Sequence, residues 1–254
     1  TLFRSEYEVL WLQGGGRLQF AMIPMNFLGS DATAGYIDSG FWAHDAQEHA
    51  KQFGNVLTLA STKEEKYHSL PILSEQIPSH LSYVHYTTNN TIYGTQFSSI
   101  PSCSVPLFAD MSSDIFSEER DYSRFDLFYA VAQKNLGAAG VTLVVVRKNM
   151  LHKIVRSLPP ILDYRQQAMH HSVLNTPPVF AIFVFKRQKR EAANFFVLGI
   201  VALAFEFLLN TYFYQRPVLP IWGYFYYNAV AGLAAQYGTA PFYLGLEILW
   251  RFMT

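Results

Sequence analysis

Short apolar runs alternate with glycine-, proline- and polar-rich breaks along the first part of the chain. Two segments with helical spacing, residues 18–28 and 42–53, each follow an apolar run, and Gly54 is suitably placed to end the second. β-Branched and aromatic content predicts strands over residues 8–12, 35–39, 56–60, 83–86, 105–109, 127–132 and 141–146. The last run is almost purely β-branched, as in a central strand buried on both faces. Strands alternating with helices predict an α/β fold with a mostly parallel sheet.

Two polar residues stand where predicted strands end. Asp110 follows the run 105–109, and Lys134 follows the run 127–132. Open α/β sheets bind ligands at the carboxyl ends of their strands, so we expect the site in these loops. Asp110 can be a helix cap, a partner for a cationic ring nitrogen or, least favoured because His, Glu and Cys are absent nearby, a metal ligand. A further carboxylate, Asp114, is a candidate N-cap. Lys134 is either a solvated surface lysine or, if buried with a lowered pKa, an amine suited to forming a Schiff base.

A glycine turn and a tryptophan complete this set of candidates. Gly14 to Gly16 lie between a predicted strand and a predicted helix, where backbone N–H groups can approach an anion, and Arg17 adds a positive charge. By themselves, these features fit an ordinary tight turn equally well, and Trp42 fits an ordinary core aromatic. Together with Lys134 and Asp110 they fit pyridoxal phosphate, which needs a lysine, a carboxylate, an aromatic plate and an anion cradle.

Nine short motifs resemble the phosphoserine aminotransferase family of class-V, fold-type I pyridoxal-phosphate enzymes. They occur in the family's order across about residues 5–184: LQGGGRLQF (12–20), PMN (24–26), SGFW (39–42), NNTIYG (89–94), ADMSSD (109–114), AQKN (132–135), GVT (140–142), LDY (162–164) and NTPP (175–178). Asn90 stands where an acidic residue is expected. The resemblance implies the large cofactor-binding domain of that fold.

The resemblance also implies a role for each candidate residue. The implied cofactor contacts are Gly16 and Arg17 with the phosphate, Trp42 with the pyridine ring, Thr91 near the ring hydroxyl, Asp110 with the ring nitrogen, Gln133 beside the cofactor and Lys134 as its covalent attachment. Asn175 and Thr176 are expected to reach the cofactor phosphate of a second subunit, which implies a homodimer. No metal is implied.

The reaction implied by the resemblance is a ping-pong amino transfer. Glutamate gives its amino group to 3-phosphohydroxypyruvate, yielding 2-oxoglutarate and phosphoserine for serine biosynthesis. Lys134 moves the α-proton, and Asp110 holds the ring nitrogen protonated. We expect this activity to be incomplete, because the family's N-terminal substrate contacts would precede Thr1 and its small C-terminal domain would follow Val184.

Composition narrows the remaining possibilities. The 254 residues carry no net charge, which gives no argument for a nucleic-acid partner. One cysteine excludes a disulfide framework. The opening on Thr1 suggests a fragment. For residues 1–184, the aminotransferase-like domain, the expected location is the cytoplasm.

The end of the chain has a different character. Residues 185–191 form a basic junction, and residues 192–209 are almost wholly apolar, close to the length that spans a bilayer. We expect residues 192–254 to be an apolar helical tail that contacts a membrane, with a buried helix as the alternative. Part of it resembles dolichol-phosphate-mannose-dependent mannosyltransferases of the endoplasmic reticulum, through YFY (212–214), VLP (218–220), FYYNAV (225–230) and QYGTAP (236–241).

Three readings of the whole chain follow. The first is an aminotransferase piece joined, naturally or by an error of assembly, to a membrane-protein piece. The second is a membrane mannosyltransferase piece with an aminotransferase-like passenger. The third is an inactive domain that binds pyridoxal phosphate without the substrate groups.

Overall fold

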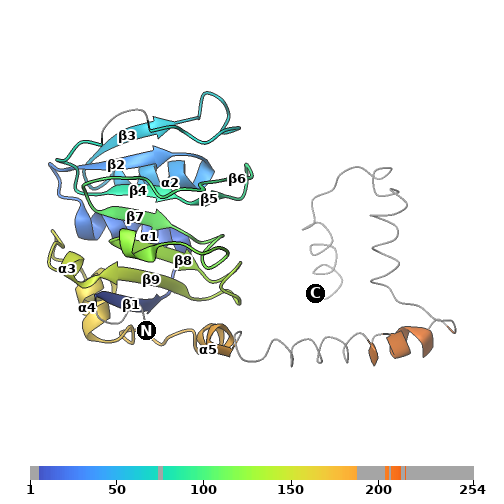
Figure 1. Cartoon of the computed structure of the whole chain (residues 1–254). Helices are drawn as coiled ribbons and strands as arrows, with labels where there is room; N and C mark the ends of the chain where they lie inside the picture. The colour runs from blue at the N-terminus through green and yellow to red at the C-terminus, as the bar shows by residue number, and fades with distance from the viewer. Residues whose placement is uncertain (1–5, 74–76, 188–203, 206, 213–214, 216–254) are drawn as a thin grey trace. The chain divides into compact units, whose positions relative to one another are not determined.

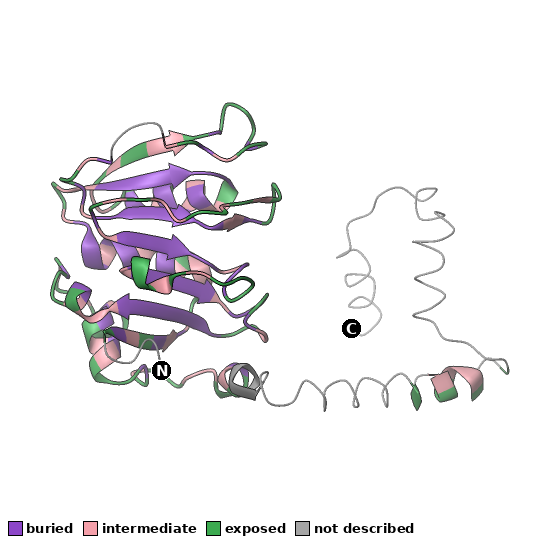
Figure 2. Ribbon diagram, viewed as in Figure 1, coloured by how far each residue is buried: buried purple, intermediate pink, exposed green. Residues whose placement is uncertain are grey.

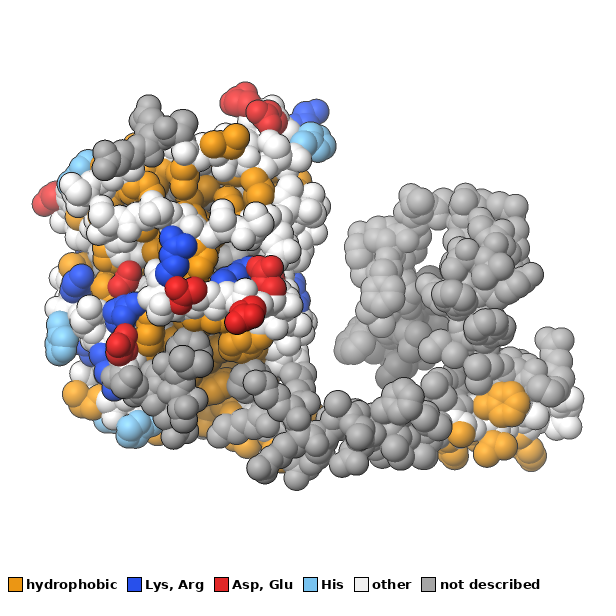
Figure 3. All heavy atoms as spheres, viewed as in Figure 1, with side chains coloured by type: hydrophobic (Ala, Val, Ile, Leu, Met, Phe, Trp, Pro, Cys, Tyr) orange, Lys and Arg blue, Asp and Glu red, His pale blue; other side chains and the backbone are white. Residues whose placement is uncertain are grey.

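The computed structural model describes residues 6–73, 77–187, 204–205, 207–212 and 215 (Figure 1). The chain divides into two compact units, Thr1–Gln188 and Lys189–Thr254. The first unit holds the sheet and all the candidate site residues. Acidic and basic side chains lie interspersed on the face of this unit seen in Figure 3.

A seven-stranded sheet forms the centre of the first unit (Figure 1). Its strands, in spatial order, are β1 (Tyr7–Leu12), β9 (Thr142–Arg147), β8 (Leu127–Val131), β7 (Leu107–Asp110), β4 (Val84–Thr87), β2 (Thr33–Asp38) and β3 (Asn55–Ser61). The strands from β8 to β3 are parallel, whereas β9 is antiparallel to both β8 and β1. The predicted α/β fold with a mostly parallel sheet is therefore confirmed, with β9 as the reversed strand.

In the described part of the first unit, five helices and a small hairpin accompany this sheet. The helices are α1 (Gly15–Phe27), α2 (Phe41–Ala50), α3 (Lys148–Leu151), α4 (Tyr164–Met169) and α5 (Val179–Arg187). The hairpin pairs β5 (Asn89–Asn90) with β6 (Thr95–Gln96), and single 3₁₀ turns lie at Tyr122–Arg124 and Pro160–Leu162. The seven predicted strands and two predicted helices all appear in the structure, with ends that differ by a few residues.

The inner strands of the sheet, from β9 to β2, are buried on both faces, whereas the edge strand β3 is partly exposed (Figure 2). One core cluster joins α1 and α2 to the sheet and contains Phe20, Phe27, Phe108 and Tyr129. The other lies between the opposite face and the connecting loops, and it contains Tyr86, Met111, Phe125 and Val145. Strand β9 is buried over its first five residues, as its apolar sequence predicts, although both its neighbours are antiparallel.

Three local predictions are wrong. Helix α1 begins at Gly15 rather than residue 18, because the glycines form its first turn. Helix α2 ends at Ala50, so Gly54 is not its C-terminal cap; Gly54 instead lies where a Cβ would come 2.5 Å from the Gly29 carbonyl oxygen. Asp114 caps no helix; it is buried and pairs with Arg120 at 2.9 Å.

The predicted tail falls almost wholly outside the described residues. Helix α5 runs past residue 184, and residues 204–205 and 207–212 are helical. Within the part of the chain that is described, every helix is too short or too polar to cross a bilayer. The predicted apolar span at 192–209 lies largely outside the described residues, so the structure does not test it.

Candidate active site

The sheet register brings the candidate loops together at one end of the sheet. Thr87, the last residue of β4, is paired with Asp110, and Asp110 is paired with Tyr129. On the other side of β8, Val131 is paired with Thr142, which is also the partner of Leu12. The loops that follow β1, β4, β7 and β8 therefore open on the same edge, as the carboxyl-end rule predicts.

These loops enclose a cavity of about 280 Å³. Its lining includes six of the predicted site residues: Gly16, Arg17, Trp42, Asp110, Gln133 and Lys134. Residues from four separate strand ends and the start of α2 thus converge on one space.

The glycine turn forms the N-terminus of α1 at the cavity wall. Gly14 and Gly15 have φ angles of 95° and 70°, in the left-handed region that favours glycine. The first N–H groups of any helix have no intrahelical acceptor, and no side chain caps those of α1. A Cβ at Gly14 would lie 2.3 Å from Leu18 Cδ2. The turn therefore requires glycine and leaves free donors at the positive end of a 13-residue helix.

Trp42 and Arg17 form the wall beside this turn. The Arg17 guanidinium lies 5.3 Å from the centroid of the Trp42 ring, and Arg17 Nε donates to Asp45 Oδ2 at 3.1 Å. The Arg17 side chain is mostly exposed. Because the Arg17 guanidinium is paired with Asp45, the backbone N–H groups of the turn are the main hydrogen-bond donors for a bound anion.

Asp110 lies buried at the floor of the cavity. Its Oδ1 accepts hydrogen bonds from the Ser112 backbone N–H at 2.9 Å and from Ser112 Oγ at 2.6 Å. Burial raises the pKa of Asp110 above its ordinary value, while the hydrogen bonds from Ser112 and the charge of Lys134 act in the opposite direction. The two hydrogen bonds from Ser112 therefore hold Oδ1 of this buried carboxylate.

Lys134 lies in the loop after β8 and is exposed. The burial that we considered for this lysine is wrong, because the loop carries its side chain to the rim of the cavity. Lys134 Nζ donates to Thr91 Oγ1 at 3.5 Å, so Thr91 approaches the lysine from outside the cavity lining. Gln133, the preceding residue, also lines the cavity.

Several lining residues were missed from the sequence: Phe20, Thr87, Asn89, Ser112, Ser113 and Val131. Ser112 and Ser113 directly follow Asp110, so their place after a strand end was a usable signal. Thr87 ends its strand in the same way. Among the described residues, the buried Thr87 Oγ1 has no hydrogen-bond partner.

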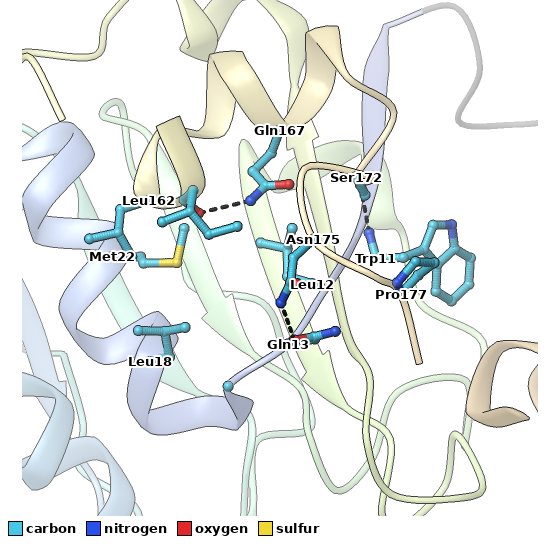
Figure 4. A pocket seen from close by; sticks show the side chains of 12 residues that line it. Trp11, Leu12, Gln13, Leu18, Met22, Leu162, Gln167, Ser172, Asn175 and Pro177 are labelled. Atoms are coloured by element: carbon cyan, nitrogen blue, oxygen red, sulfur yellow. Dashed lines mark hydrogen bonds between the residues drawn. The ribbon is translucent and has the colours of Figure 1, made fainter. Parts of the chain in front are cut away.

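Asn175 and Thr176 lie elsewhere. Asn175 lines a second cavity of about 280 Å³, which shares Gly14 with the first (Figure 4). Asn175 Nδ2 donates to Gln13 Oε1 at 2.8 Å, and Gln13 Nε2 donates to the Thr176 carbonyl. Both residues are exposed. The structure thus groups Asn175 and Thr176 on the far side of the glycine turn, away from Asp110 and Lys134.

The part of the chain that contains this cavity is similar in sequence to known enzymes. The chain is 51% identical to the phosphoserine aminotransferase of Lysinibacillus sphaericus over 182 residues, which is 71% of this chain and 50% of that protein. It is 48% identical to that of Flavobacterium psychrophilum over 177 residues, 70% of this chain and 49% of the relative. The chain spans about half the length of these curated relatives.

Solved structures agree with this match. The phosphoserine aminotransferase from Bacillus circulans subsp. alkalophilus superimposes with a TM-score of 0.68 at 45% identity, over 71% of this chain and 51% of that one. A phosphoserine aminotransferase from Trichomonas vaginalis, solved with pyridoxal phosphate bound, gives 0.68 at 30% identity over 75% and 59%.

Two family models match different parts of the chain. The Alg9-like mannosyltransferase model matches residues 169–246, in agreement with the resemblance noted for the tail. The class-V aminotransferase model matches residues 3–191, most of the chain and every candidate site residue. The chain therefore belongs to the class-V aminotransferase family.

Proposed function

We propose that this chain is the cofactor-binding part of a phosphoserine aminotransferase and that it binds pyridoxal phosphate in the cavity below Lys134. One observation carries the proposal: an amine, a buried carboxylate, an aromatic ring and an uncapped helix N-terminus line the same cavity. Pyridoxal phosphate requires these four groups together. The similarity to phosphoserine aminotransferases at about half their length supports the same assignment.

The residues present fit the phosphate end of the cofactor. The first N–H groups of α1 lack acceptors, and Gly15 leaves open space where a side chain would stand. Ser113 from the loop after β7 adds a hydroxyl to the lining. A phosphate at this helix N-terminus is stabilised by the free donors and by the helix dipole.

The residues also fit the ring end. Trp42 offers an aromatic face, and Asp110 offers a buried carboxylate to a protonated pyridine nitrogen. When bound, the cofactor supplies an electron-withdrawing ring that stabilises negative charge on a substrate carbon. Lys134 Nζ would attach the cofactor and then accept and return the α-proton, as general base and acid. Asp110 would hold the ring nitrogen in its charged form.

The substrates belong to the same proposal. Amino transfer from glutamate to 3-phosphohydroxypyruvate, in serine biosynthesis, follows from the names of the relatives. The described lining carries two cations, Arg17 and Lys134, and Arg17 is paired with Asp45. Substrate anions would therefore need further cations from outside the described lining. In a homodimer, the exposed residues Asn175 and Thr176 would contact the cofactor phosphate of the partner.

The test is binding of pyridoxal phosphate to the full chain. We expect a visible absorption band that persists after gel filtration and is absent in Lys134→Ala. Lys153→Ala changes an exposed lysine that lies outside this cavity, and it should keep the band. Equal bands in both variants, or no band in the folded wild-type protein, would refute the proposal. A band that changes on addition of L-phosphoserine but not of L-serine would support a phosphorylated substrate for this site.

The tail is proposed separately. We infer that residues 192–254 form a membrane-associated segment of the endoplasmic reticulum, whereas the first unit has the character of a cytoplasmic enzyme. The match of residues 169–246 to the Alg9-like mannosyltransferase model supports this inference. Flotation of the full chain with phospholipid vesicles is the direct test, and failure to float would contradict membrane association.

A further inference from the structure

A buried threonine at the floor of the first cavity has a hydroxyl group without a partner. Thr87 is the last residue of β4, it lines the cavity, and it is 3% exposed. Among the described residues, no hydrogen-bond partner meets its buried Oγ1 atom. Buried polar groups nearly always have a partner, because an unpaired one has lost its bonds to water without replacement. The Thr87 hydroxyl in this state therefore costs the empty protein stability.

Other polar groups that line this cavity are bonded within the protein. Ser112 Oγ donates to Asp110 Oδ1 at 2.6 Å, and Asn89 Nδ2 donates to Ser113 Oγ at 2.9 Å. Among the described residues of the lining, Thr87 alone has a buried side-chain atom without a hydrogen-bond partner. The unpaired hydroxyl is thus a property of this one position and not of the surrounding loops in general.

The sheet register places Thr87 beside Asp110. The two residues are paired in the parallel ladder between β4 and β7. Paired residues on neighbouring parallel strands project from the same face of a sheet, and such strands lie about 4.8 Å apart. Trp42 lines the same cavity from the start of α2. Thr87 therefore lies one strand away from the proposed partner of the ring nitrogen, at the edge of the space that the cofactor ring would fill.

The chemistry of the cofactor ring offers this hydroxyl one suitable partner. The ring nitrogen carries a proton and is assigned to the Asp110 carboxylate, which can only accept. The ring oxygen, on the second carbon from that nitrogen, can accept from a threonine hydroxyl. Thr91 is expected near this oxygen from the family resemblance, yet it lies outside the cavity lining, where Lys134 Nζ donates to its Oγ1 at 3.5 Å. Thr87 is the threonine that the structure places in the lining.

We propose that Thr87 is a further cofactor-contacting residue, whose hydroxyl donates to the ring oxygen of pyridoxal phosphate beside the Asp110 carboxylate. The inference rests on the proposed function, because it takes this cavity as the cofactor site. The empty protein bears the cost of the unpaired hydroxyl, and binding of the cofactor removes that cost. Thr87 thereby favours a ring that carries an oxygen at this position over one that lacks it.

A binding cycle with two ligands tests this contact. The wild-type full chain and Thr87→Val are each titrated with pyridoxal phosphate and with 3-deoxypyridoxal phosphate, which lacks the ring oxygen. Thr87→Val keeps the shape of the side chain and removes its hydroxyl. We expect the substitution to weaken binding of pyridoxal phosphate about tenfold, as for the loss of one hydrogen bond, and to leave binding of the deoxy analogue unchanged. Equal weakening for both ligands, or none for pyridoxal phosphate, would overturn the contact with the ring oxygen.

The stability of the empty protein gives a readout that does not depend on the cofactor. Because the described part of the protein offers the Thr87 hydroxyl no partner, Thr87→Val should leave the urea midpoint of the cofactor-free full chain unchanged or raise it. A midpoint clearly below that of the wild type would show that this hydroxyl already has a partner in the empty protein, which would overturn the inference.

Thr142→Val is the matched control. Thr142 is also buried, and among the described residues its Oγ1 atom likewise has no hydrogen-bond partner, but Thr142 does not line the cavity. Thr142→Val should therefore resemble Thr87→Val in urea and yet keep wild-type binding of pyridoxal phosphate. Equal losses of binding in the two variants would mean that the effect does not come from contact with the cofactor, and the role of Thr87 would be wrong.

A second pair of variants applies if Thr87→Val does not fold. Thr87→Ser and Thr87→Ala both lose the methyl group, and only Thr87→Ser keeps the hydroxyl. Thr87→Ser should bind pyridoxal phosphate about tenfold more tightly than Thr87→Ala. Equal binding by the two variants would contradict a hydrogen bond from this position.

Binding by the wild-type protein separates this inference from the proposed function. If the wild type shows the band that depends on Lys134 but the changes at Thr87 leave its affinity for pyridoxal phosphate unaltered, the inference is wrong and the proposed function stands. If the folded wild-type protein does not bind pyridoxal phosphate, the proposed function fails, and the role of Thr87 fails with it.

Discussion

At the scale of single residues, a buried ion pair supports the loop beneath the site. Arg120 Nη2 lies 2.9 Å from Asp114 Oδ2, and both side chains are less than one-tenth exposed. Asp114 also accepts from Thr88 Oγ1 and from Gln96 Nε2. One carboxylate thereby joins the strand ends of β4 and β6 to the loop after β7, which carries the serines of the cavity.

Removing the cation should destabilise the protein strongly. Arg120→Ala leaves a buried carboxylate without its charge partner, and such a loss costs about 3–5 kcal/mol. Urea unfolding of the full chain measures it. Lys51→Ala breaks the exposed Lys51–Glu48 pair and should cost less than about 1 kcal/mol. An equal loss in the free energy of unfolding for Arg120→Ala and Lys51→Ala would show that burial does not set the cost of losing the cation.

Some single residues of the site could be predicted from the sequence, and others could not. Asp110 and Lys134 were predictable because each follows an apolar strand run. His85 and Tyr129 lie inside such runs, where a histidine or tyrosine looks like ordinary core. The contact between His85 Nε2 and the Tyr129 hydroxyl, at 3.2 Å, also spans β7, which lies between their strands, so it depends on a strand order that residue patterns do not contain.

At the scale of elements, the start of α1 is the most constrained part of the site. Gly14→Ala would place a Cβ at φ 95° and within 2.3 Å of Leu18 Cδ2. We expect a loss of about 1–3 kcal/mol in the free energy of unfolding, together with weaker binding of pyridoxal phosphate. Thermal unfolding and a binding titration of the full chain measure the two effects.

Two further glycines separate strain from a clash in this turn. Gly15→Ala also has a positive φ, of 70°, but its Cβ would meet open space, so it should cost less than Gly14→Ala. At Gly29, a Cβ would meet only Ala32 Cβ at 3.6 Å, an ordinary contact, and Gly29→Ala should be nearly neutral. The opposite ranking would contradict the geometry described for the turn.

Element boundaries show a different limit of the sequence. The pattern of apolar residues located α1 and α2 but set their ends several residues off. The pattern places the glycines before α1 as a break in the chain, whereas Gly15 and Gly16 form the first turn of that helix. The pattern favours Gly54 as a helix cap, whereas its close approach to the Gly29 carbonyl oxygen explains the glycine better. The role of Gly54 thus depends on a neighbour that is distant in sequence.

At the scale of the whole molecule, His85 links stability to pH. Burial lowers the pKa of this histidine to about 3 in the folded protein, against about 6.5 when unfolded, so the unfolded chain binds the extra proton between these values. Stability therefore falls as pH drops below about 6.5, by roughly 5 kcal/mol at most. Above that pH this contribution is fully present.

A titration of unfolding free energy against pH tests this. His85→Gln should flatten the fall between about pH 6.5 and 3, once its own constant loss is subtracted. His152→Gln, at an exposed histidine, should keep the wild-type slope. An unchanged slope in His85→Gln would show that other groups dominate the acid response.

The pairing of β1 with β9 has a consequence for the time at which the site forms during synthesis. The glycine turn directly follows β1, yet among the described residues the one strand paired with β1 is β9, whose residues Thr142–Arg147 are made more than a hundred positions later. A nascent chain that has emerged only as far as β8 already contains Asp110, Tyr129 and the glycines, but the glycine turn has no strand to anchor it. The cradle for the cofactor phosphate is thus expected to close only after β9 leaves the ribosome, among the slowest contacts of the fold to form.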